Sequence, residues 1–441
     1  MIGGGIAGLT AAYRLSAAHD VVVFEREATG GGKIRSQKIA GGYLFEWGPS
    51  GFLASAEAVQ SLVDELELRD VLTPASEAAK KRFIYWNGRL HALPAKPPEA
   101  LKMTILSPLG KLRAFRELFV AKGAGAEDES VLAFMQRRFG REVAERLVAP
   151  ALLGVSGGDA ATTSLAAVFP RVLEIEAAHG SVLRGMIDGP RRSTGLVSFA
   201  EGGMQTLSDR LAEHLGPRFW GGTTVERIER DGAGWRIVRT GGTMAADGVI
   251  LATPADTAAQ LLAGVDETLA ERLREIPYAP MRVVGVAFRT SDVPVPLDGF
   301  GFLAARNQGV RLLGAFFTST IIPEHAPPGT AYLRIFLGGS TDPGIAALDA
   351  DAVKAIVLDD LRTVLGITAQ PIAHHEILWP QAIPQYGLRH RAIVRAIEAR
   401  EAQLPGLALA GNAYRGLGVG DDVRDALAVA DRMSAMLPVN A

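Results

Sequence analysis

The stretch Met1-Ile2-Gly3-Gly4-Gly5-Ile6-Ala7-Gly8-Leu9 opens the chain and decides its fold. The spacing of Gly3, Gly5 and Gly8 is the glycine fingerprint of a strand, turn and helix that bind a dinucleotide. The first glycine permits the tight turn, the second lets a pyrophosphate approach the backbone, and the third allows close helix packing. We therefore predict that Gly3, Gly5, Ile6, Ala7 and Gly8 bind a cofactor.

An acidic residue stands where a dinucleotide fold needs one. The apolar run 21–24 predicts a buried strand, and Glu25 follows it. A carboxylate about 20 residues after the fingerprint accepts ribose hydroxyls, so we predict that Glu25 and the adjacent Arg26 belong to the cofactor site. Only Met1 and Ile2 precede the first glycine, so we expect the sequence to begin several residues late in the strand that enters this turn.

Composition narrows the class of protein. With 441 residues, of which 48% are hydrophobic and 21% charged, the chain has material for a large core and two or three regions. A net charge of -2 gives no reason to expect nucleic acid as a partner. The absence of cysteine excludes disulfides, cysteine-ligated iron–sulfur clusters, thiolate nucleophiles and the dithiol flavin reductases. No apolar run is long enough to suggest a membrane span, so we expect a cytoplasmic protein.

Later glycine-rich stretches favour a flavin dinucleotide over a nicotinamide one. Gly31-Gly32-Lys33 follows the ribose acid, and a hairpin-like stretch over residues 41–46 leads to residues 48–51. A second glycine pair lets the backbone approach the cofactor again, as it does around FAD in enzymes of the amine oxidase type. The alternative is a glycine-rich hairpin without a ligand. The cofactor-binding residues predicted here are Gly32, Lys33, Gly48, Pro49, Ser50 and Gly51.

Three further segments return to the dinucleotide fold. Residues 221–228 and 247–254 predict short strands, and the first is expected to place Val225 beside the adenine. Residues 407–410 predict a last strand, followed by a glycine-rich turn and a helix from about residue 421 to 436. A helix N-terminus offers N–H donors and a positive dipole end to a phosphate or to a flavin oxygen. We predict cofactor contacts at Gly411, Gly418, Val419 and Gly420.

Motifs along the whole chain resemble those of the oxygen-dependent protoporphyrinogen oxidase family, which also contains coproporphyrinogen III oxidases. Two of these motifs are specific within the wider amine oxidase superfamily, namely residues 299–303 (GFGFL) and 383–386 (IPQY). The others are the stretches at 48–52, 82–85, 91–94, 169–170 and 337–339 and the glycine run at 411–420.

The resemblance implies an α/β fold with a discontinuous FAD-binding Rossmann-type domain, an antiparallel-sheet substrate domain and a helical region that could contact a membrane. We assign residues 1–75, 196–275 and 395–441 to the first, 76–91 and 276–394 to the second, and 92–195 to the third. The implied reaction is a six-electron oxidation of protoporphyrinogen IX or coproporphyrinogen III in haem biosynthesis. The flavin carries the chemistry, so no catalytic side chain or metal is expected, and oxygen reoxidises the flavin to give hydrogen peroxide. A homodimer is compatible with this resemblance.

The resemblance also implies roles for particular side chains. Arg82 matches an arginine that pairs with a substrate propionate, and a guanidinium suits a carboxylate; the alternative is a surface arginine beside Lys81. Phe336 by periodicity alone is a core strand residue. The residues that match the substrate pocket are Gly154, Phe300, Gly301, Leu303 and Phe336, of which the aromatic and leucine side chains sandwich the pyrrole rings and Gly301 gives the macrocycle room.

The chain departs from that family in two places. Ser156 and Gly157 stand where relatives carry an aromatic residue and alanine, which predicts an altered pocket floor. Gly420 replaces an asparagine and Asp422 a cysteine, so we expect weaker hydrogen bonding to the flavin or a shifted potential.

Residues 97–122 mix apolar side chains with five cations, which predicts a basic amphipathic helix. Such a helix lies in a membrane interface or packs on its own domain with a solvated outer face. A helical pattern continues from Ser130 to about residue 192, and strands are expected between 276 and 377. His374 and His375 are neighbours on a strand and point to opposite sides, which argues against a shared metal.

Two other classes of protein remain open from the sequence. An amine oxidase or a carotenoid desaturase shares the FAD framework, although Arg82 and the 299–303 motif fit neither. A non-catalytic flavin-binding or haem-pathway interaction protein is the other alternative, because the first strand is short and Gly420 is unusual.

Overall fold

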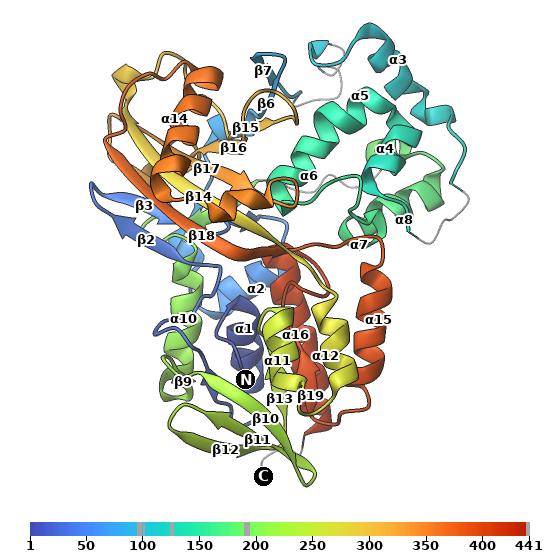
Figure 1. Cartoon of the computed structure of the whole chain (residues 1–441), viewed down its shortest axis with the longest axis vertical. Coiled ribbons are helices and arrows are strands. Elements are labelled where there is room, and N and C mark those ends of the chain that lie inside the picture. The colour runs from blue at the N-terminus through green and yellow to red at the C-terminus, as the bar shows by residue number, and fades with distance from the viewer. Residues whose placement is uncertain (95–98, 100–101, 124–127, 189–194, 438–441) are drawn as a thin grey trace.

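A parallel sheet lies in the lower half of the molecule and is built from segments far apart in the sequence (Figure 1). The computed structural model describes residues 1–94, 99, 102–123, 128–188 and 195–437. Strand β1 (Val23–Phe24) pairs with β9 (Phe219–Trp220), and β13 (Val249–Leu251) pairs with β19 (Leu407–Leu409), both in parallel. Ile2 joins the two pairs through parallel bridges to β1 and β13. The start, middle and end of the chain therefore share one sheet, as the sequence predicted.

Helices cover both faces of this sheet because its strands are apolar on both sides. In β13, Ile250 belongs to one core, whereas Val249 and Leu251 belong to the other. The first core contains α1 (Ile6–Leu15), α2 (Glu57–Glu65), α10 (Gln205–Leu215) and α16 (Val419–Met436). The second contains α11 (Ala255–Leu262), α12 (Glu267–Arg274) and part of α15 (His390–Glu401).

Small antiparallel sheets flank the parallel one. The predicted hairpin is present as β2 (Ser36–Ile39) and β3 (Tyr43–Glu46). The segment between β9 and β13 forms β10 (Val225–Asp231), β11 (Gly234–Arg239) and β12 (Gly242–Ala246). A third sheet has the order β4 (Phe52–Leu53), β8 (Leu196–Phe199) and β5 (Leu72–Pro74).

A seven-stranded mixed sheet forms the upper part of the molecule in Figure 1. Its order is β18 (Ala373–Pro384), β14 (Tyr278–Arg289), β17 (Thr330–Gly338), β16 (Leu312–Phe317), β15 (Gly301–Ala304), β6 (Phe83–Trp86) and β7 (Arg89–Ala92). All neighbours are antiparallel except β15 and β6. Residues 276–377 were expected to supply such strands, and the structure confirms this.

The alternation of side chains along β17 separates the two faces of the large sheet. Leu333, Ile335 and Leu337 are buried in a core that includes α14 (Ala350–Leu365). Tyr332 and Phe336 belong to a second cluster on the opposite face, together with residues of β3. This second face is therefore the one directed toward the dinucleotide fold.

A helical region lies beside the large sheet, at the upper right of Figure 1. Ser130 begins α4 as predicted, because its hydroxyl accepts a hydrogen bond from the Ala133 N–H. The predicted helix over 97–122 is shorter: α3 begins after Ser107 and ends in a 3₁₀ turn at Arg116–Phe119. Positions 97–98, 100–101 and 189–192 of the predicted helices lie outside the described residues. The helices are α3 (Pro108–Phe115), α4 (Val131–Phe139), α5 (Arg141–Val143), α6 (Ala149–Ser156), α7 (Leu165–Val168), α8 (Pro170–His179) and α9 (Val182–Asp188).

Within the described ranges, none of the helices combines the length and the apolar character needed to cross a membrane.

Candidate active site

The glycine fingerprint forms a turn that leads into α1. Gly3 has φ +102°, and a Cβ there would lie 2.5 Å from the Ala252 carbonyl oxygen. A Cβ on Gly8 would lie 1.9 Å from the Gly3 oxygen, so both positions exclude a side chain. A Cβ on Gly5 would meet nothing within 4 Å, so this residue faces open space. The first N–H groups of α1, which include those of Ile6 and Ala7, have no intrahelical acceptor and are suited to an anion.

Glu25 lies beside this turn at the end of β1. Its Oε2 accepts a hydrogen bond from the Gly4 N–H at 2.6 Å, and its Oε1 accepts one from the Glu27 N–H at 2.8 Å. These two bonds fix the orientation of the carboxylate, and each oxygen keeps acceptor capacity for a ribose hydroxyl. Arg26 is exposed and pairs with Glu27 at 3.5 Å. The Thr223 N–H donates to the Glu25 carbonyl, which places the start of β10 and Val225 next to this corner.

The second glycine pair lies against the first turn. The Gly31 N–H donates to the Gly4 carbonyl at 2.8 Å, and Gly5 and Gly31 form a parallel bridge. Gly32 has φ +59°, and a Cβ there would lie 3.1 Å from the Gly5 Cα. The two glycine turns therefore expose backbone side by side.

Lys33 follows this pair and is a half-buried cation. Burial lowers its pKa to about 8, and its ammonium lies 5.3 Å from the centre of the Tyr278 ring. Asp422 and Asp256 raise the pKa of Lys33 at longer range, but no carboxylate in the described part of the chain forms an ion pair with it. A lysine in this state is suited to an anionic ligand such as a pyrophosphate.

The loop at residues 47–51 is held by the large sheet. Arg334 of β17 donates to the carbonyl oxygens of Glu46 at 3.2 Å and Gly48 at 2.9 Å. The indole N–H of Trp379 donates to the Trp47 carbonyl at 2.9 Å. A Cβ on Gly48 would lie 2.1 Å from the Lys33 carbonyl oxygen, so the loop presses against the lysine backbone. Pro49, Ser50 and Gly51 continue this loop to β4.

Arg334 and Glu46 form a buried charged cluster that sequence reasoning missed. Burial lowers the pKa of Arg334 to about 10 and raises that of Glu46 to about 7. The Ser36 hydroxyl and the Met204 N–H donate to the Glu46 carboxylate at 2.7 and 2.9 Å. The only signal in the sequence was a single arginine inside the otherwise apolar run 332–337.

The C-terminal glycine turn is fixed by Tyr386 of the IPQY motif. The Tyr386 hydroxyl donates to the Asn412 carbonyl at 2.7 Å and accepts from the Gly416 N–H at 2.9 Å. Gly411 has φ +113°, and a Cβ there would meet nothing within 4 Å. Gly418 precedes the first residue of α16, Val419, and carries no side chain to cap the free N–H groups. This turn thus presents a second open helix N-terminus.

Two unusual residues lie in the first turn of α16. A Cβ on Gly420 would lie 2.9 Å from the Ala56 Cβ, so an asparagine would require a shift of one of the two backbones. The Asp422 Oδ1 is buried without a hydrogen-bond partner, and burial raises the pKa of Asp422 to about 8. Lys33 partly offsets this effect.

These features fit a flavin dinucleotide. Two glycine-led helix N-termini, the Lys33 ammonium and the oriented Glu25 carboxylate supply the donors and acceptors that pyrophosphate and ribose require. Buried polar atoms without partners, Thr253 Oγ1 and Asp422 Oδ1, remain around the same elements.

The large sheet carries a row of aromatic rings on the face that bears Arg334. The centres of Phe300 and Phe316 lie 4.8 Å apart, and those of Phe316 and Phe336 also lie 4.8 Å apart, both edge to face. The Arg334 guanidinium lies 5.1 Å from the Phe336 ring centre. Phe316 was missed by the sequence reasoning, although its strand pairs Gly314 with Phe336 and so leaves space for these rings.

Arg82 lies at the end of this row. Its guanidinium is 5.3 Å from the centre of the Phe300 ring, and its side chain is exposed. The neighbouring Lys81 forms an ion pair with Asp298, whereas Arg82 has no ion pair within the described ranges. The structure thus brings Arg82, Phe300 and Phe336 onto one surface, and a role for Arg82 in binding a carboxylate stays a prediction.

Leu303 and Gly154 also lie together. A Cβ on Gly154 would lie 2.2 Å from the Leu303 Cδ2, so a side chain at position 154 would require the Leu303 side chain to shift. Gly301 has φ +138°, and its Cβ would lie 2.0 Å from the Ala315 carbonyl oxygen. The backbone of the sheet alone therefore requires glycine at position 301. A role of Gly301 in making room for a macrocycle stays a prediction.

Ser156 and Gly157 end α6. The Ser156 hydroxyl donates to the Leu152 carbonyl at 2.8 Å, and Gly157 adopts a left-handed conformation with φ +63°. The Ser340 N–H donates to the Gly157 carbonyl at 2.7 Å, which ties the helix end to the turn that follows β17. Together these contacts form a compact helix stop.

Comparison with known proteins gives a consistent result. A model of the family described as flavin containing amine oxidoreductase matches residues 6–434. The chain is 32% identical to the mitochondrial protoporphyrinogen oxidase of Nicotiana tabacum, with 99% of this chain and 94% of that protein covered. It is 28% identical to the coproporphyrinogen III oxidase of Bacillus subtilis (strain 168), with 96% and 94% covered.

Solved structures show the same fold. A protein of Exiguobacterium sp. 255-15, described as a candidate protoporphyrinogen oxidase, gives a TM-score of 0.86 at 24% identity and covers 99% of this chain and 98% of that one. Reduced UDP-galactopyranose mutase gives 0.78 at 14% identity, with 99% and 95% covered. At these identities the likeness establishes the fold alone.

Proposed function

The chain belongs to the family of flavin-containing amine oxidoreductases and, within it, to the porphyrinogen oxidases; from this premise we propose that it uses FAD to oxidise protoporphyrinogen IX or coproporphyrinogen III to the porphyrin. This reaction is a step of haem biosynthesis. Molecular oxygen is the proposed electron acceptor, and hydrogen peroxide is the second product.

One observation carries the choice of substrate class, namely the aromatic row of Phe300, Phe316 and Phe336 that ends at Arg82. A porphyrinogen is a broad apolar ring with carboxylate side chains. Aromatic rings bury apolar surface, and a guanidinium at one end of the row can form a bidentate pair with a carboxylate. Small amines need neither a wide apolar surface nor a cation at its edge.

The protein's contribution is binding and orientation. FAD, when bound, supplies the capacity to accept hydride equivalents. Glu25, Lys33 and the two helix N-termini are positioned to hold the ribose and pyrophosphate. Arg334 holds the 47–51 loop from the same strand that carries Phe336, so hydrogen bonds connect the substrate face to the cofactor loop. Arg82 orients the substrate through its carboxylate.

The test is a steady-state assay of the purified yellow protein with each porphyrinogen. We expect oxygen consumption and a rise of porphyrin fluorescence, and the ratio of kcat/KM for the two substrates identifies the physiological one. Oxidation of primary amines without porphyrin fluorescence would instead favour an amine oxidase, and a carotenoid desaturase would act only on the carotenoid. A protein that binds FAD and turns over none of these would be the non-catalytic alternative.

We also propose that α3 contacts a membrane surface. Leu109, Leu112, Phe115 and Phe119 are 77%, 60%, 49% and 86% exposed, at spacings that place them on one side of the helix and its 3₁₀ extension. A large exposed apolar patch commonly marks a contact site. Arg113 is not part of the outer charge, because its guanidinium donates to the Arg138 and Arg137 carbonyl oxygens at 2.8 and 2.7 Å.

Flotation with anionic liposomes tests this contact. The variant Leu109→Ser/Leu112→Ser/Phe119→Ser is expected to lose recovery with the vesicles. The control Leu53→Ser/Ile372→Ser changes apolar residues that are 51% and 47% exposed elsewhere and should float like the unmodified protein. Equal recovery of all three proteins would contradict the proposal.

A further inference from the structure

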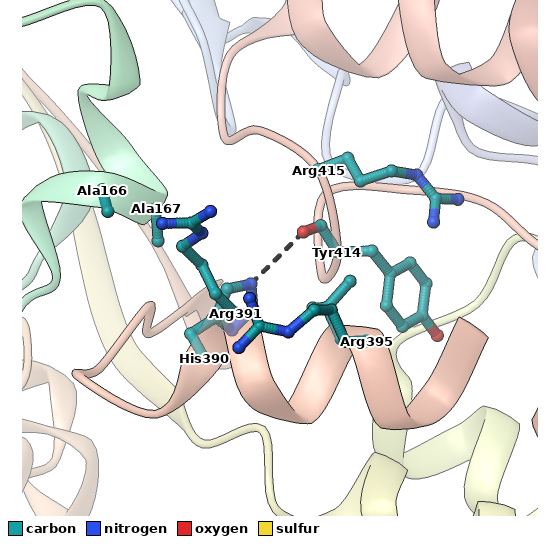
Figure 2. Close-up of a pocket in the computed structure, with 8 residues that line it drawn as sticks. Ala166, Ala167, His390, Arg391, Arg395, Tyr414 and Arg415 are labelled. Atoms are coloured by element: carbon teal, nitrogen blue, oxygen red, sulfur yellow. Dashed lines mark hydrogen bonds between the residues drawn. The ribbon is translucent and has the colours of Figure 1, made fainter. Parts of the chain in front are cut away.

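A cavity of about 220 Å³ lies between α15, α7 and the loop at residues 414–415 (Figure 2). Neither the aromatic row nor the glycine turn at residues 3–8 lines it. Its lining includes Ala166 and Ala167 of α7 and Arg391 and Arg395 of α15. The two alanines leave room and offer no side-chain acceptor. The cavity is smaller than the roughly 300–1,000 Å³ of pockets for drug-sized ligands, so it suits a small molecule or a headgroup.

Arg391 and Arg395 are both exposed and give this open cavity its charge. They stand one helical turn apart, and neither forms an ion pair or a side-chain hydrogen bond within the described ranges. The other two arginines of this segment are paired: Arg389 with Glu275 at 3.5 Å and Arg400 with Asp266 at 2.8 Å. In Figure 2 the guanidinium groups of Arg391 and Arg395 lie on the side of Ala167. Two unpaired guanidinium groups on one face of α15 therefore face the same space.

The other polar groups of the lining do not neutralise this charge. Arg415 points away in Figure 2 and is engaged by Asp425 at 2.5 Å and Glu398 at 2.9 Å. His390 contacts the Tyr414 carbonyl through Nε2 at 3.3 Å, and burial lowers its pKa to about 4, so it adds no charge at neutral pH. The cavity thus carries two positive charges from Arg391 and Arg395.

We propose that this cavity is a binding site for a phosphate group, either inorganic phosphate or a phosphate ester. Two guanidinium forks match the charge and the tetrahedral oxygens of such a group. The site also lies at the N-terminal turn of α15, whose dipole favours an anion.

The site is connected to the cofactor turn. The His390 ring stacks on Tyr386 at 3.7 Å and 12°. The Tyr386 hydroxyl binds Asn412 and Gly416, which lie in the glycine turn before α16. A ligand that orders the start of α15 therefore stiffens the turn on which we expect the flavin to rest. Phosphate should consequently change the flavin absorbance or fluorescence of the holoenzyme.

The test compares three holoproteins: the unmodified chain, Arg391→Gln/Arg395→Gln, and the control Arg218→Gln/Arg289→Gln. The control removes the same charge from η6 (Gly216–Arg218) and the end of β14. Inorganic phosphate and glycerol 1-phosphate are titrated at constant ionic strength, with the thermal midpoint, calorimetric heat and flavin fluorescence as readouts. We expect saturable binding to the unmodified chain and the control, and at least tenfold weaker binding to the α15 variant.

Vesicles containing phosphatidylglycerol distinguish the two sources of the phosphate group. Binding to vesicles that depends on Arg391 and Arg395, without a response to soluble phosphate, identifies a lipid headgroup. Saturable soluble binding identifies a free phosphate or ester. Equal responses of the unmodified chain and the α15 variant to both probes, or no response of the unmodified chain to either, would overturn the proposal. If the double variant fails to fold, the single variants Arg391→Gln and Arg395→Gln replace it in the same titrations. Arg395→Lys should bind phosphate with intermediate affinity, because lysine keeps the charge but lacks the guanidinium fork.

Discussion

Replacing Lys33 by methionine should have opposite effects on the stability of the apoprotein and on its affinity for FAD. Lys33 is half-buried and has no ion-pair partner in the described part of the chain, and burial lowers its pKa from 10.5 to about 8. This difference corresponds to about 3 kcal/mol of destabilisation of the folded apoprotein by the ionised side chain. Methionine keeps a similar stem without the charge, so the free energy of unfolding of apo Lys33→Met should rise by up to that amount at pH 7.

The same substitution removes a cation from the proposed pyrophosphate site. A hydrogen bond to a charged group contributes about 1.5–3 kcal/mol, so the affinity for FAD should fall by roughly ten- to hundredfold.

The pH dependence has a definite sign. The folded-state pKa of Lys33 lies below the unfolded value, so the penalty is fully present below pH 8 and disappears as the pH rises from about 8 toward 10.5. The stability advantage of apo Lys33→Met over the unmodified apoprotein should therefore shrink across this window. Urea unfolding at pH 7 and pH 9.5 and quenching of flavin fluorescence measure the two quantities, and Lys38→Met at an exposed position serves as the control. Unchanged FAD affinity together with a less stable apoprotein would refute the reasoning.

Three further outcomes follow from the site and the core. In steady-state kinetics, Arg82→Ala should raise the KM for the porphyrinogen more than it lowers kcat, because Arg82 is proposed to bind a substrate carboxylate and not to take part in the chemistry. A lower kcat with an unchanged KM would argue against this role. Phe316→Ala should raise KM by about tenfold with the flavin spectrum unchanged, and an unchanged KM would remove the aromatic row from the substrate surface. Glu117→Gln should lower the free energy of unfolding in urea by about 3–5 kcal/mol, because Glu117 and Arg138 form a fully buried ion pair. Ser181 also donates a hydrogen bond to the Glu117 carboxylate. A loss below about 1 kcal/mol would show that the pair is dispensable.

Local signals predicted the dinucleotide fold well. The glycine fingerprint, the apolar run before Glu25 and the C-terminal glycine turn each depend on backbone geometry that only a few residue types permit, so the sequence identifies them directly. The structure places all three around one parallel sheet. The predicted helix near residue 421 begins two residues earlier, at Val419, because Gly418 serves as the boundary residue.

Long-range partnerships were beyond the reach of the sequence. Arg334 donates hydrogen bonds to the carbonyl groups of residues 46 and 48, nearly 290 positions away, and no local sequence pattern predicts such a contact. Phe316 joins the aromatic row through strand register, which depends on which strands become neighbours.

Charge patterning was misleading in the segment 97–122. Glu117 and Arg113 look like solvated residues of an amphipathic helix, yet Glu117 is fully buried and Arg113 binds backbone carbonyl oxygens. The sequence does not reveal that Arg138 and the end of α4 lie against this segment. The outer surface of α3 is accordingly more apolar than its composition suggests.

The most direct test of the central claim is a single-turnover experiment without oxygen. The FAD-loaded protein is mixed anaerobically with excess coproporphyrinogen III or protoporphyrinogen IX while the flavin absorbance is followed. We expect bleaching of the oxidised flavin with at least one substrate, and recovery of the flavin together with porphyrin fluorescence once air is admitted. A fully loaded protein whose flavin stays oxidised with both substrates would contradict the assignment as an FAD-dependent porphyrinogen oxidase.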